Sequence, residues 1–147
     1  MEPDLSVIYC HDDNNLMTIK YDIKRFRSLC KSFEEFNDEP ICIPAKIKYV
    51  NMFLAFLDNK IIPDSNSDII ELLKISQFCD ISNKDKYHLL NLIRRKIVSR
   101  HGISQQTLNK YIMTHPKQMK PFDYETTRYV IQNIDELLNF VCYDSIA

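Results

Sequence analysis

The stretch from Pro44 to Ile97 constrains the fold most, because three segments with apolar faces follow one another there at helical spacing. The inward positions recur three and four residues apart at Ile47, Val50, Phe53, Leu54 and Leu57, then at Ile69, Leu72, Leu73, Ile75 and Cys79, and finally at Leu89, Leu90, Ile93 and Ile97. The middle segment is expected to begin at Ser67–Asp68, with Glu71 completing a capping box. Faces of this kind must be buried against other elements, so the middle of the chain predicts a helical stack.

Short strands are expected ahead of this stack. Apolar residues alternate with other residues over 5–10 and again over 17–21, and a polar cluster separates the two runs, which predicts a β-hairpin. Asp22 then stands at an N-cap position, and apolar residues at helical spacing from Ile23 to Phe36 predict a helix of about 14 residues. The β-branched run 41–43 predicts a third strand, closed by Pro44, which also suits the first position of the next helix.

Helices are also expected in the last third of the chain. Its breaks are predicted at Ser82–Asn83, Gly102, Pro116 and Pro121. Ser104 is placed to cap a short helix. From Tyr124 to Val141 apolar positions recur three and four residues apart without interruption, which predicts one continuous final helix.

Composition narrows the classes of function. The 147 residues suit one ordinary domain, and the net charge of −1 removes the global electrostatic argument for binding nucleic acid. A single glycine excludes glycine-rich phosphate loops. No apolar run approaches the roughly 20 residues that a membrane-spanning helix needs. We therefore expect a soluble protein that is not secreted and has neither a nucleic acid nor a membrane as partner.

The cysteines and histidines do not form a recognisable site. The five cysteines are odd in number and scattered, which is typical of reduced thiols and favours the cytoplasm, the nucleus or both. No C-x-x-C or H-x-x-x-H spacing occurs, so no metal or cofactor is expected. Arg94 and Arg95, in the basic run 84–100, could contact an acidic partner face, although a solvated helix face explains that run equally well.

Several phrases, in the correct order, resemble the BTB/POZ superfamily and its Skp-type F-box adaptor and elongin C branches. Ile41-Cys42-Ile43-Pro44, with the apolar helix after it, resembles the family's strand end and following helix. The segment Leu72–Ile81 is similar to the adaptor phrase Leu-x-x-Ala-Ala-Asn-Tyr/Phe-Leu-Asp-Ile, with Phe78, Asp80 and Ile81 aligned and the alanines replaced. The segment 30–33 keeps the aromatic of a Ser-x-x-Phe ending without its serine, and 97–112 resembles the extra helix of the Skp branch.

The resemblance implies a fold and a division of the chain. The expected class is α+β, BTB/POZ-like, with a small three-stranded sheet covered by a stack of five to six helices. Residues 1–103 would form the BTB/Skp-like core, and residues 104–147 would form a C-terminal helical extension packed on the same domain.

The resemblance also implies a function. Family members are non-catalytic protein-interaction adaptors, so the chain is expected to link or intercept a cullin-type ubiquitin ligase, with a cullin or an F-box- or SOCS-box-like receptor as partner. Phe78 and Asp80 would belong to the cullin-facing surface, with Phe78 alternatively a core side chain, and Tyr111 and Ile112 to a second surface. Few residues precede the first strand, which favours a monomer or heterodimer over an intertwined homodimer.

Two other interpretations stay open at this stage. The first is a compact helical protein of viral type that sequesters host signalling factors through an apolar groove, in which case the hairpin is absent. The abundance of Ile, Asn and Lys, typical of an AT-rich viral or protozoan genome, is compatible with that source. The second is a small enzyme, for which the sequence offers no triad, phosphate loop or ligand cluster. We expect a protein that is not an enzyme.

Overall fold

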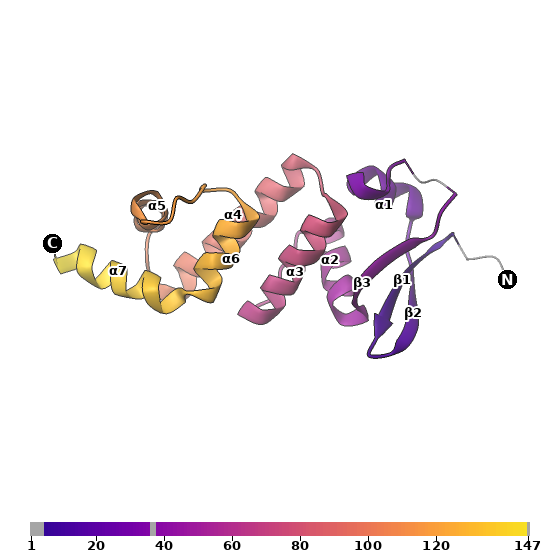
Figure 1. Cartoon of the computed structure of the whole chain (residues 1–147), viewed down its shortest axis with the longest axis horizontal. Coiled ribbons are helices and arrows are strands. Elements are labelled where there is room, and N and C mark those ends of the chain that lie inside the picture. The colour runs from indigo at the N-terminus through magenta and orange to yellow at the C-terminus, as the bar shows by residue number, and fades with distance from the viewer. Residues whose placement is uncertain (1–4, 36–37, 147) are drawn as a thin grey trace. The chain divides into compact units, whose positions relative to one another are not determined.

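The computed structural model describes residues 5–35 and 38–146, which form three β-strands, seven α-helices and one 3-10 helix (Figure 1). The α+β class is as expected, whereas the helices outnumber the predicted five to six. The chain divides into two compact units, Met1–Lys86 and Tyr87–Ala147. This boundary falls inside helix α4 (Asn83–His101), and not between residues 103 and 104.

The first unit contains a mixed sheet with the strand order β2-β1-β3. Strands β1 (Val7–Asp12) and β2 (Asn15–Lys20) pair antiparallel, which confirms the predicted hairpin. Asp13 takes a left-handed conformation in the turn, at φ 53°, which aspartate tolerates better than most residues. The sheet contradicts the alternative of a purely helical protein.

Strand β3 (Ile41–Lys46) is longer than the sequence indicates, because Pro44 lies within it and does not begin the next helix. β3 pairs parallel with β1 and forms an edge of the sheet, where the missing N–H of a proline does not interrupt a ladder. The register between the two strands shifts between Tyr9 and His11. Helix α2 (Ile47–Asn59) therefore begins three residues after Pro44.

Helix α1 (Ile23–Leu29) is half as long as expected, although Asp22 caps it by accepting the N–H of Arg25. It ends because Cys30 forms a β-bridge with Ile81, and the 3-10 helix η1 (Lys31–Phe33) follows. A contact with a residue distant in sequence thus overrides the helical spacing. Phe36, placed in this helix by its spacing, lies outside the described residues.

Helices α2 and α3 (Asn66–Cys79) pack side by side, and α2 contacts all three strands (Figure 1). Ser65 caps α3 by accepting the N–H of Asp68, so the cap precedes the predicted Ser67–Asp68 start. The unit's core is built from fully buried side chains of the strands and all three helices: Ile8, Ile41, Phe26, Phe53, Phe56, Leu57 and Leu72.

The second unit is helical and comprises most of α4, α5 (Gln105–Thr114), α6 (Tyr124–Gln132) and α7 (Ile134–Ile146). Gly102 ends α4 in the left-handed conformation, at φ 63°, and Ser104 caps α5 by accepting the N–H of Thr107, both as expected. Leu89, Leu90, Ile93, Leu108 and Leu137 are almost completely buried in this unit.

The predicted final helix is wrong in one respect, because it is broken into α6 and α7 at Asn133. This residue has φ −129° and ψ 43°, outside the helical range, and its side-chain amide donates to the Tyr129 carbonyl oxygen at 2.8 Å. The break adds one helix to the expected number.

Candidate protein-interaction site

The end of α3 and the residues after it, 76–81, form a sharp corner. Asp80 takes the left-handed conformation at φ 51°, and its N–H bonds to carbonyl oxygens of the last turn. Ser76, buried on the inner side, donates its hydroxyl to the Leu72 carbonyl oxygen at 2.8 Å. The chain therefore leaves the helix abruptly, immediately after Phe78 and Cys79.

The segment 30–33 holds this corner from the other side. The Ser32 hydroxyl donates to the Phe78 carbonyl oxygen at 2.9 Å, and the Lys31 N–H donates to the Asp80 carbonyl oxygen at 3.0 Å. Together with the bridge between Cys30 and Ile81, these bonds satisfy carbonyl groups that a helix end leaves unpaired. The backbone of Phe78 is consequently fixed by residues about fifty positions earlier.

The Phe78 side chain lies at the surface, with 47% of the residue exposed. One side of its ring contacts Phe33, with the ring centroids 6.2 Å apart. Cys79, next in sequence, is completely buried and carries the inward contact at this turn. Of the two sequence interpretations, the core position therefore belongs to Cys79, and the aromatic ring faces water.

Two hollows flank Phe78, and Ile43, Pro44 and Phe78 line both of them. The first has a volume of about 210 Å³ and is bounded by Ile75 and Lys74 of α3. The second has a volume of about 400 Å³ and is bounded by β1 and by the exposed side chain of Leu16. We call Phe78, Pro44 and these two hollows the Phe78 surface. This surface is open and mostly apolar, and all of it belongs to the first unit.

The polar groups of the Phe78 surface are few. Lys74 pairs with Glu71 across 3.3 Å on α3, so their charges offset one another. The Asp80 side chain is exposed, two residues after Phe78. Nδ1 of His11, in the wall of the larger hollow, is buried and has no hydrogen-bond partner within the described residues. A buried polar atom without a partner costs free energy.

The other sequence-predicted residues lie in the second unit, and three of the four are buried. Tyr111 and Ile112 are each 2% exposed, and Arg94 is 4% exposed. Only Arg95 is exposed. The structure thus brings Phe78 and Asp80 together at one corner, and it places Tyr111, Ile112 and Arg94 inside their own unit, where their side chains serve packing.

Sequence reasoning missed a polar cluster around Glu136, near the start of α7. Its carboxylate accepts the hydroxyl protons of Tyr111 at 2.7 Å and Tyr129 at 2.9 Å, and it contacts Nε2 of His115 at 2.5 Å. Nδ1 of His115 accepts the N–H of Lys117 at 3.0 Å, which places the ring proton on Nε2. No local sequence motif predicts this cluster, because its members come from α5, the following loop, α6 and α7.

The cluster shifts the pKa values of its members. Hydrogen bonds from Tyr111, then Tyr129 and His115, hold the pKa of the Glu136 carboxyl below its usual value, and burial together with the bond to Glu136 raises the pKa of Tyr111. A depressed carboxyl pKa stabilises the folded state above the unfolded-state pKa, and that contribution is lost as the pH falls through the folded-state pKa.

The free energy of unfolding of the wild type should therefore fall more steeply below about pH 4.5 than that of Glu136→Gln. Chemical denaturation monitored by circular dichroism at pH 6, 5, 4 and 3 measures the difference. The other carboxyl groups titrate in both proteins, so the difference isolates Glu136. Parallel pH dependences in the two proteins would contradict the assignment.

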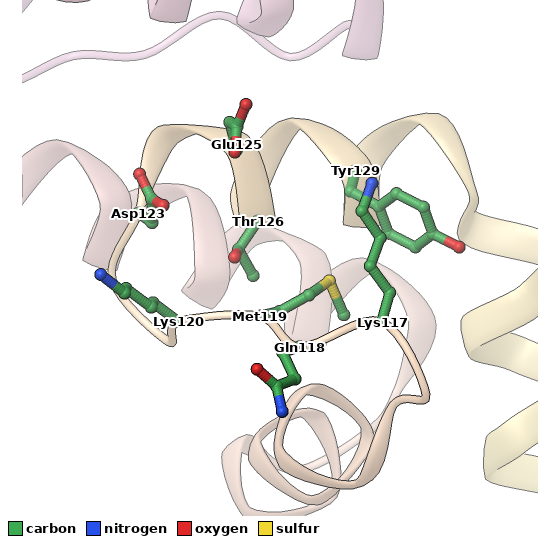
Figure 2. A pocket seen from close by; sticks show the side chains of 8 residues that line it. All are labelled: Lys117, Gln118, Met119, Lys120, Asp123, Glu125, Thr126 and Tyr129. Atoms are coloured by element: carbon green, nitrogen blue, oxygen red, sulfur yellow. The ribbon is translucent and has the colours of Figure 1, made fainter.

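A further hollow of about 240 Å³ lies between the loop after α5 and the start of α6 (Figure 2). Both signs of charge line it, from Lys117 and Lys120 on the loop and from Asp123 and Glu125 on the helix. The Lys117 ammonium group lies 4.9 Å from the centre of the Tyr129 ring and is thereby engaged within the unit. The mixture of charges does not select an anion or a cation.

Within residues 5–35 and 38–146, no group of three or more His, Cys, Asp or Glu residues is arranged to hold a metal ion. None of the helices in that part of the chain has the length and apolar character required to cross a bilayer. All five cysteines are free thiols. No protein-family model, no curated protein and no solved structure matches the chain.

Proposed function

We propose that the protein is a non-enzymatic interaction adaptor of the BTB/POZ type, nearest to the Skp branch, and that it binds its partner through the Phe78 surface. The observation that carries the proposal is the exposure of Phe78 on a rigid corner between two hollows. Aromatic anchors beside well-formed hollows are typical of the residues that dominate protein interfaces.

The architecture of the first unit supports the same proposal. A hairpin, a short helix, a third strand parallel to the first, and helices packed on that sheet follow one another in the order that the sequence resemblance implies. The aligned phrase ends at Ile81, and the two aligned polar and aromatic side chains, Asp80 and Phe78, are both exposed. The resemblance and the surface therefore point to the same residues.

The partner that this surface suits is a helical scaffold protein of the cullin type. A helix of such a partner would bury the Phe78 ring and insert apolar side chains into the hollows on either side of Pro44. This mode of binding serves either of two roles. The chain would link a cullin-type ubiquitin ligase to another protein, or it would intercept that ligase.

The proposal does not extend to Tyr111 and Ile112 as partner contacts, since both side chains are buried in the second unit. An F-box- or SOCS-box-like receptor would have to use other residues of that unit. Free thiols throughout the chain favour a reducing compartment, the cytoplasm or the nucleus. A monomer that forms heterodimers is the proposed state.

Replacing Phe78 by arginine is expected to weaken binding to a cullin by roughly 30-fold or more, because loss of a central aromatic anchor costs about 2 kcal/mol or more. Isothermal titration calorimetry of the full chain against purified N-terminal domains of several cullins measures the effect. The arginine is compatible with folding, because the side chain at this position is already half exposed.

Ile61→Arg is the matched control, since Ile61 is 58% exposed in the first unit and lines neither hollow. Its affinity should stay within about twofold of the wild type. If no cullin domain binds the wild-type chain, the cullin assignment is wrong. If a cullin binds and both variants retain full affinity, the Phe78 surface is not the binding site.

A further inference from the structure

The break between α6 and α7 occurs where the local sequence does not demand one. The segment 124–146 contains neither proline nor glycine, the two residues that most often end or kink a helix. Asn133 nevertheless leaves the helical conformation. Helix α6 ends at Gln132, just before it, and helix α7 begins at Ile134, just after it. Within the segment, the bond from the Asn133 side-chain amide to the Tyr129 carbonyl oxygen favours the break, and contacts outside the segment add to it.

The apolar stripe of this segment does not require the break either. Its members recur at helical spacing straight through Asn133: Thr127, Val130, Ile131, Ile134, Leu137, Leu138 and Val141. A continuous helix would carry all of them on one face. The spacing of the stripe thus does not favour the bent form over a straight one, and another interaction must select the bent form.

The Glu136 cluster supplies that interaction. In a continuous helix, which turns by about 100° per residue, Tyr129 and Glu136 would lie on the face opposite the apolar stripe. A straight helix that packs its stripe on the unit would therefore point both side chains away from α5. In the structure, Glu136 reaches Tyr111 of α5 and His115 at its C-terminal end. The change of direction at Asn133 allows the stripe and the polar cluster to face the unit together.

The surrounding groups stabilise the same arrangement. Tyr111 contacts Phe140 of α7, with ring centroids 5.4 Å apart, and Lys110 forms an ion pair with Asp144 on the same helix. Lys117 lies over the Tyr129 ring and donates its N–H to Nδ1 of His115. These are the charged and titratable groups that face the cluster from α5, the loop, α6 and α7. Each contact on α7 depends on the direction that this helix takes after Asn133.

We propose that Asn133 is the hinge of a two-state helix pair, in which hydrogen bonds from Tyr111 and His115 to Glu136 latch the bent form and their release lets residues 124–146 join into one straight helix. The device is independent of the Phe78 surface, because every residue in it belongs to the second unit. Release would carry Phe140 and Asp144 away from α5.

Backbone and aromatic NMR of the isotopically labelled full chain tests this proposal with Glu136→Ala. The wild type should show non-helical 13Cα shifts at Asn133 and a nuclear Overhauser contact between the Tyr111 and Phe140 rings. In Glu136→Ala the 13Cα shift of Asn133 should become helical, so that helical shifts run without interruption from residue 131 to 135, and that ring contact should disappear. Asp135→Ala, an equal change at the exposed neighbouring carboxylate, should keep the wild-type signals.

Tyr111→Phe, which removes one hydroxyl group only, provides a second and milder variant. Its shifts at Asn133 should move part of the way towards those of Glu136→Ala, as expected for two states in exchange. If Glu136→Ala keeps the non-helical shifts and the ring contact, the latch does not exist. Loss of helical shifts throughout 134–146 would also overturn the proposal, because α7 would then unwind instead of joining α6.

Discussion

Replacing Phe26 by alanine is expected to lower the free energy of unfolding by about 3–5 kcal/mol, the largest effect of any single substitution considered for this protein. Phe26 is completely buried and joins three rings, with centroids 6.0 Å from Tyr21, 5.6 Å from Phe33 and 6.3 Å from Phe53. Its helix, α1, has only seven residues and cannot be stable without packing. Urea denaturation monitored by far-ultraviolet circular dichroism measures the loss.

Phe78→Ala is the matched control for this prediction, because the same side chain is removed from the half-exposed edge of the same aromatic group. Its cost should be about 1 kcal/mol, since much of the ring is already in water. Equal losses in the free energy of unfolding for the two variants would contradict the prediction. They would mean that the buried ring of Phe26 contributes no more stability than the half-exposed ring of Phe78.

Replacing Arg94 by alanine is expected to destabilise the second unit by about 2–4 kcal/mol and to release the loop between α5 and α6. The buried guanidinium group donates to Oδ1 of Asn109 and to the Pro121 carbonyl oxygen, and it stacks on the Phe122 ring at 5.0 Å. One side chain of α4 therefore joins the middle of α5 to the end of the loop that precedes α6. No other amino acid side chain offers the same planar set of donors.

Limited proteolysis with trypsin, combined with urea denaturation, measures the effect of Arg94→Ala. Cleavage after Lys117 in the loop should become at least tenfold faster than in the wild type, because about 1.4 kcal/mol of lost local stability corresponds to a factor of ten. Arg95→Ala, the exposed neighbour on the same helix, should change stability by no more than about 0.5 kcal/mol. Similar cleavage rates in the two variants would disprove the anchoring role of Arg94.

The elements that could be predicted are those whose signals are local. Alternation on both sides of a polar turn predicts the hairpin, and Asp22, Gly102 and Ser104 mark helix ends that the structure confirms. Each of these signals depends on hydrogen bonds or backbone preferences within a few residues. The sheet order β2-β1-β3 could not be obtained in this way, because the pairing of β1 with β3 joins residues more than thirty positions apart.

The candidate site was predictable in part. The phrase 72–81 singles out Phe78 and Asp80, and the left-handed turn at Asp80 and the bonds from residues 31 and 32 keep both side chains outside. Amphipathic spacing alone could not decide whether Phe78 or Cys79 points inward, since both lie near the edge of the apolar stripe. Tyr111 and Ile112 could not be recognised as buried, because the elements that cover them come later in the chain.

By itself the sequence determined the class of the fold and the positions of most helices and strands, because hydrophobic period and capping act over one or two turns. Only the tertiary structure decided that Pro44 belongs to a strand, that α1 stops at Cys30, and that Asn133 breaks the last helix. In each case local preference permits two conformations of similar free energy. Contacts with residues far along the chain select between them: the pairing of β3 with β1, the bridge between Cys30 and Ile81, and the bond between Tyr111 and Glu136.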